Sequence, residues 1–148
     1  MDGFGETWAR LRGRPAADFL ATARDAVAAV VLFDQFPRNM FRGTAEAFAT
    51  DPLALAIAKG ALDRGYEEQL SEGERSFLYM PLMHSEDLAD QDRSAALFEA
   101  LGWADPAKFA RLHRDMIARY GRFPARNAAL GREDRPGEDE GIAASREW

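Results

Sequence analysis

Two segments of the chain carry arginine, asparagine and proline in nearly the same order. Residues 36–39 read Phe-Pro-Arg-Asn, and residues 123–127 read Phe-Pro-Ala-Arg-Asn. Apolar residues and a further arginine follow each of them, so we define the first Phe-Pro segment as residues 34–43 and the second as residues 123–132. A guanidinium group binds a carboxylate or a phosphate through paired hydrogen bonds. The two segments could therefore hold an anion between them.

Two explanations of these arginines remain open. In the first, Asp34, Asp51, Glu86 and the carbonyl groups at helix C-termini neutralise them in an internal network that fixes how helices meet. In the second, surplus positive charge lines a cleft and binds an anionic small molecule or a short acidic peptide. The arginines in question are Arg38, Arg42, Arg119, Arg122, Arg126 and Arg132.

Asp34 lies directly after four large apolar residues, 30–33. An unpaired carboxylate in a protein interior is destabilising by several kcal/mol, so Asp34 needs a partner. Arg38 is four residues further on and would share a helical face with Asp34. The spacing therefore predicts an ion pair between them.

His84 is followed by two carboxylates, at Glu86 and Asp87. A general acid/base pair of His84 with Glu86 or Asp34 is one hypothesis, and a junction histidine bonded to a backbone carbonyl is the alternative. His113 lies in an apolar stripe and is expected to be a core residue. No ligand spacing typical of zinc sites and no nucleophile or phosphate-loop motif is present, so we expect neither a metal nor a cofactor.

The net charge of −6 argues against general binding to nucleic acid, which requires a basic surface. Residues 133–148 hold six acids against two arginines and so carry −4 of this charge. The chain has no cysteine, no N-terminal apolar leader and no apolar run of membrane-spanning length. These features predict a cytoplasmic protein that does not enter a membrane.

The sequence predicts helices throughout and no strand. Capping signals place helix starts at Thr22, at Asp51-Pro52, at Ser71 and Glu74, at Ser85 and at Asp105-Pro106. The expected helices cover about 23–35, 52–64, 72–82, 86–101 and 106–120, with one or two further turns at 44–50. Short connections favour antiparallel neighbours. We expect an all-α single domain of helical hairpins over residues 1–132, followed by a loose acidic tail at 133–148.

Several motifs in this order resemble a bacterial family called domain of unknown function 924. The resemblance covers about residues 18–132 and rests on 34–39, 42–43, 47–49, 51, 74–79, 81–86, 90–91, 121–124, 126–127 and 130–132. It implies an all-helical fold similar to tetratricopeptide-like hairpin assemblies, and it implies no known activity. Ala125 stands where that family usually has a histidine. The family also tends to begin with an aromatic-rich segment upstream of this chain, and it closes with a segment that the acidic tail replaces here.

The leading hypothesis is an anion-binding pocket lined by both Phe-Pro segments. The second is a small hydrolase or transferase that uses the same pocket, and the third is a protein-interaction scaffold whose polar network is purely structural. An enclosed pocket between the segments would favour the first two, whereas exposed aromatic residues beside a filled arginine network would favour the scaffold. The candidate ligand-binding residues are Gln35, Arg38, Asn39, Arg42, Gln91, Arg122, Arg126 and Asn127, and the catalytic candidates are Asp34, His84 and Glu86.

Overall fold

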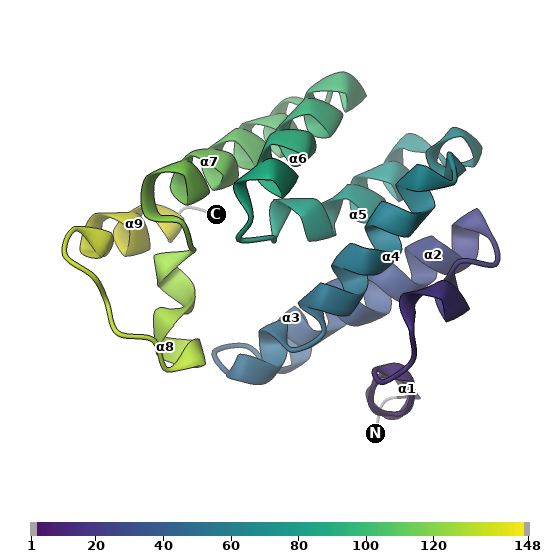
Figure 1. Cartoon of the computed structure of the whole chain (residues 1–148), viewed down its shortest axis with the longest axis horizontal. Helices are drawn as coiled ribbons and strands as arrows, with labels where there is room; N and C mark the ends of the chain where they lie inside the picture. Colours follow the sequence, from purple (N-terminus) through teal and green to yellow (C-terminus); the bar gives the residue numbers. More distant parts are fainter. Residues whose placement is uncertain (1–2, 147–148) are drawn as a thin grey trace. The chain divides into compact units, whose positions relative to one another are not determined.

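The computed structural model describes residues 3–146, and every regular element in that range is a helix (Figure 1). The all-α fold class is therefore confirmed. The chain divides into two compact units. The first contains the residues up to 42 together with 46–81, and the second contains 43–45 together with the residues from 82 onward. Between residues 3 and 146, no helix combines the length and the apolar composition that crossing a bilayer requires.

The first unit is built on the packing of α2 against α4. Its elements are α1 (Gly3–Leu11), η1 (Ala16–Phe19), α2 (Ala23–Val30), η2 (Val31–Gln35), α3 (Phe36–Met40), α4 (Asp51–Asp63) and η4 (Tyr66–Gln69), with most of η3 (Ala45–Phe48) and of α5 (Glu72–Met83). The facing surfaces of α2 and α4 are rich in alanine, which lets the two helices approach closely. Val30 and Ile57 are fully buried there, and each stabilises the fold by roughly 1.5–3 kcal/mol.

Local capping explains where two of these helices begin. The Thr22 hydroxyl accepts a hydrogen bond from the Asp25 N–H at 3.1 Å, which starts α2 as predicted. Ser71 and Glu74 form a reciprocal capping box at the start of α5, with N–H to side-chain distances of 3.0 and 3.2 Å. Pro81 lies inside α5, which continues to Met83.

The helix predicted over residues 23–35 differs from the observed one. α2 ends at Val30, a π-turn (η2) follows, and α3 continues through Pro37 to Met40. Asp51 is the first residue of α4 rather than its N-cap, which is Thr50. The carboxylate of Asp51 instead binds Arg38, as described below.

The second unit is organised around an antiparallel hairpin of α6 and α7 (Figure 1). Its elements are α6 (Leu88–Leu101), α7 (Ala104–Tyr120), η5 (Pro124–Arg126), α8 (Asn127–Leu130) and α9 (Glu138–Ser145). Gly102 has a φ of 82°, a left-handed conformation that glycine adopts without strain, and it ends α6 so that α7 can reverse direction. Met116, Ile117 and Phe123 form an apolar cluster at the other end of α7.

Residues 133–146 are not the loose tail that their composition predicts. α9 packs against α7 with Gly141 buried, and Glu138 at its start is only 1% exposed. The helix is held because Glu138 is a hydrogen-bond acceptor for groups of the second Phe-Pro segment, a requirement that local composition does not reveal.

Candidate functional site

The first Phe-Pro segment is shaped by a proline in the middle of a helix. Pro37 has no N–H, so the Phe33 carbonyl four residues earlier loses its usual helical donor. The Thr50 hydroxyl donates to that carbonyl at 2.7 Å and accepts from the indole N–H of Trp8 at 3.1 Å. The Phe36 N–H reaches back five residues to the Val31 carbonyl, which produces the π-turn. The Phe33 carbonyl and the Phe36 N–H thus both keep hydrogen-bond partners around the proline.

Arg38 is clamped by two carboxylates of the first unit. Its Nη1 and Nη2 donate to the Oδ1 and Oδ2 of Asp51 at 2.6 and 2.9 Å. Nη1 also lies 3.0 Å from the Asp34 carbonyl and 3.5 Å from Asp34 Oδ1, so the predicted Asp34–Arg38 ion pair is present. Burial works against the charged form, but the hydrogen bonds to Asp51 and the charges of both acids raise the pKa of Arg38.

The other candidates of the first unit lie around this clamp. The Gln35 amide donates to Asp34 Oδ2 at 2.6 Å, and the Asp34 side chain is fully buried. Asn39 and Arg42 are exposed, and Arg42 Nη2 lies 3.5 Å from Asn39 Oδ1. This group is therefore a partly buried ion-pair cluster with two polar residues at the surface.

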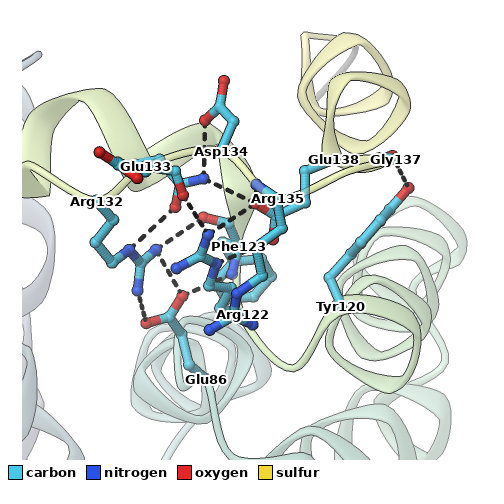
Figure 2. Close-up of polar contacts among 11 residues, drawn as sticks. Glu86, Tyr120, Arg122, Phe123, Arg132, Glu133, Asp134, Arg135, Gly137 and Glu138 are labelled. Atoms are coloured by element: carbon cyan, nitrogen blue, oxygen red, sulfur yellow. Dashed lines mark hydrogen bonds and ion pairs between the residues drawn. The ribbon is translucent and has the colours of Figure 1, made fainter.

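Glu86 is hydrogen-bonded to both ends of the second Phe-Pro segment (Figure 2). It accepts from Nη1 and Nη2 of Arg132 at 2.9 and 3.1 Å and from the Phe123 N–H at 2.6 Å. Arg132 also donates to the Phe123 carbonyl at 3.0 Å. Burial opposes ionisation of Glu86, but the hydrogen bonds from Arg132 and Phe123 and the charges of Arg126 and Arg132 lower its pKa.

Glu138 is the centre of the polar network in Figure 2. Its carboxylate accepts from Arg122 Nε and Nη2 at 2.9 and 2.8 Å, from the Asn127 amide at 3.1 Å and from the Arg135 N–H at 2.7 Å. The hydrogen bond from Arg122, followed by that from Arg135, lowers the pKa of Glu138 to about 2. Four donors on one buried carboxylate make this an architectural group.

Arg126 contacts the backbone of His84 and the ring of Phe123. Arg126 Nη2 donates to the His84 carbonyl at 2.8 Å, and its guanidinium lies 4.5 Å from the centre of the Phe123 ring. The His84 and His113 ring centres are 6.4 Å apart, and His113 Nδ1 is 2.7 Å from the Phe109 carbonyl.

Gln91, the last candidate, is fully buried in the second unit. Its amide donates to the Met83 and Ser85 carbonyls at 2.7 Å each, so it secures the turn between α5 and α6. Among the described side chains, no three histidine, aspartate or glutamate groups converge closely enough to hold a metal ion.

A separate feature of the first unit was not anticipated from the sequence. A groove of about 610 Å³ runs between α1 and the α2–η2 helix, with η1 at its side. Phe4, Thr7 and Leu11 form the α1 wall at helical spacing. These three residues lie at i, i+3 and i+7, the spacing of one continuous helical face.

The opposite wall of the groove has the same periodicity. Asp25, Ala28, Ala29 and Leu32 succeed one another at spacings of three, one and three residues, and Phe19 of η1 completes the lining with Asp18. Phe4 is 59% exposed although its ring stacks on Phe36 at 6.0 Å between centroids. The groove is therefore a mainly apolar surface open to solvent with two carboxylates on it.

Comparison with known proteins gives the family and the fold. The family model for a bacterial protein of unknown function, DUF924, matches residues 1–145. A solved structure of a protein of unknown function from Agrobacterium tumefaciens is 41% identical, with a TM-score of 0.86. The similarity covers 98% of this chain and 80% of that one. No curated protein gives a significant match.

Proposed function

Since the chain belongs to the bacterial family of unknown function DUF924, we propose a function from its own geometry: it is a non-enzymatic module that binds an apolar segment of a partner protein. The groove of the first unit carries this proposal. Its volume of about 610 Å³ is enough for several apolar side chains. The Phe-Pro segments, under the same proposal, are structural.

The exposed ring of Phe4 supports binding of an apolar partner. A phenylalanine with 59% of its surface in water, beside Leu11, Phe19 and the α2–η2 wall, forms one continuous apolar surface. Contiguous apolar surface of this kind typically marks a site of protein association. Covering it would release free energy through the hydrophobic effect, at roughly 25 cal/mol for each Å² of apolar surface removed from water.

Acids already accept the hydrogen bonds of Arg38, Arg122 and Arg132, which supports a structural role for these three arginines. An anionic ligand would have to displace Asp51 from Arg38 or Glu138 from Arg122. Either displacement would leave a carboxylate with little exposure and without its counterion, which is strongly unfavourable. Glu86 is likewise a poor general base, because three donors already hold its oxygens and lower its pKa.

Blocking the groove tests the proposal. The probe is a fluorescein-labelled synthetic helix with leucine and alanine on one face and glutamine on the other, measured by fluorescence anisotropy. Ala28 is exposed on the α2 wall, so Ala28→Trp fills the groove without entering the core. Ala56→Trp is the matched control, because Ala56 is an exposed alanine of α4 outside the groove. We expect binding by the natural chain and by Ala56→Trp, and loss of binding in Ala28→Trp. Equal binding by all three, or by none, contradicts the proposal.

The anion-binding hypothesis predicts a different result. Inorganic phosphate or citrate would raise the melting temperature of the natural chain, and Arg126→Ala would abolish that rise while changing the ligand-free melting temperature by only a few degrees. Under our proposal neither anion has a specific effect. A saturable, Arg126-dependent rise would therefore favour the anion pocket over the structural role.

A further inference from the structure

The two carboxylates on the groove identify the chemistry of its occupant. Within residues 3–146, neither the Asp18 nor the Asp25 side chain has a hydrogen bond or a salt bridge. Both are exposed and both line the groove. Asp25 donates its backbone N–H to the Thr22 hydroxyl at the start of α2, and its side chain lines the groove. An apolar groove therefore carries two negative charges that no described residue neutralises.

The shape of the groove favours a helix as its occupant. Each long wall is a ridge with helical spacing, formed by Phe4, Thr7 and Leu11 on one side and by residues 25–32 on the other. Ala28 and Ala29 are small, so a third helix can approach the α2 backbone closely. A helix laid between two such ridges presents residues at i, i+3, i+4 and i+7 to them.

The two ends of the α2 wall differ in charge. Asp25 lies in the first turn of α2, and Leu32 lies seven residues further on, which corresponds to about 10 Å along a helix. Ala28 and Ala29 lie between Asp25 and Leu32 and carry no charge. The Asp25 charge thus meets one end of an occupant along this wall, and the apolar side chain of Leu32 meets the other.

We infer that the partner segment is a basic amphipathic helix whose lysine or arginine lies against Asp18 and Asp25 while its apolar face lies against Ala28, Ala29 and Leu32. This inference rests on the proposed function, because it names the chemistry of the partner in the same groove. The net charge of −6 acts in the same direction, since it attracts a cationic segment over a longer distance.

Three synthetic helices with the same leucine and alanine face separate the inference from the proposed function. Their polar faces carry glutamine, lysine or glutamate. We expect the lysine peptide to bind more tightly than the glutamine peptide and the glutamate peptide to bind more weakly. Two exposed ion pairs predict a difference of roughly three- to tenfold at low salt between the lysine and glutamine peptides. The difference should shrink as NaCl rises from about 50 to 500 mM.

Charge-neutral variants of the full chain test the two carboxylates. In Asp18→Asn/Asp25→Asn, the preference for lysine should disappear while the glutamine peptide binds as it does to the natural chain. Asp63→Asn, at an exposed acid of α4 outside the groove, is the control and should keep the preference. Equal affinity for all three peptides overturns the inference but leaves the proposed function standing. Failure of every peptide to bind overturns both, and a preference that survives in the double variant shows that other groups select the charge.

Discussion

Removing the Thr50 hydroxyl is the sharpest test of how the first Phe-Pro segment is supported. Thr50→Val keeps the shape of the side chain. It removes the group that donates to the Phe33 carbonyl at 2.7 Å and accepts from Trp8 Nε1 at 3.1 Å. Thr50 is 3% exposed and Trp8 is 4% exposed, so water does not readily replace the lost partner. Pro37 offers no N–H to the same carbonyl.

The expected loss of stability follows from these two buried groups. A buried donor or acceptor left without a partner is destabilising by about 1–3 kcal/mol. The additional apolar surface of valine offsets up to about 1 kcal/mol. We therefore expect the free energy of unfolding to fall by roughly 2–4 kcal/mol. For a chain of this length, the melting temperature would fall by roughly 6–12 °C.

Urea denaturation followed by Trp8 fluorescence measures this loss, with Trp103 and Trp148 replaced by phenylalanine. Thr7→Val is the matched control, because the Thr7 hydroxyl makes an exposed bond to the Gly3 carbonyl. Its effect should stay within about 0.5 kcal/mol. If Thr50→Val also stays within that range, or if its effect is strictly additive with that of Trp8→Phe, the hydroxyl does not link the two elements and the reasoning is refuted.

Two predictions concern the second unit. Because the folded-state pKa of Glu138 is about 2, below the ordinary value, this residue adds stability above about pH 4.5 that is lost as the pH falls toward 2. Glu138→Gln should remove this part of the acid dependence of the urea midpoint, whereas Asp139→Asn at an exposed position should keep it; parallel curves for all three proteins would contradict the assignment. A Cβ at Gly141 would lie 2.7 Å from Tyr120 Cε2, so Gly141→Ala should release α9 and raise the hydrogen-exchange rate of its amides. Ala143→Ser, at an exposed position of α9, should not, and unchanged exchange in Gly141→Ala would show that α9 tolerates the methyl group.

Signals that act within one helical turn were readable from the sequence. Thr22 caps α2, and Ser71 with Glu74 caps α5, because the residue types and the spacing alone determine those hydrogen bonds. The pair of Asp34 and Arg38 was predictable for the same reason, since both lie on one helical face. The start of α6 was missed by two residues: Asp87 is its N-cap, whereas Ser85 bonds Asp90.

Features that depend on distant partners were not readable. The fold of residues 133–146 depends on Arg122 and Asn127, which meet Glu138 only after the chain turns back on α7. Composition alone suggests disorder there, because acidic residues with glycine and proline form few local contacts. The groove depends on α1 lying beside α2, and no local pattern encodes that neighbourhood.

The position of Glu138 limits where the chain can be shortened. A variant ending at Arg132 would keep both long helices of the hairpin but would lose the only side chain that receives two hydrogen bonds from Arg122 among the described residues. The amide of Asn127 would lose its two acidic acceptors, Asp134 and Glu138, at the same time. The acidic C-terminal stretch therefore supplies the carboxylate partner of Arg122 within the second unit, and removing it would take away that counterion.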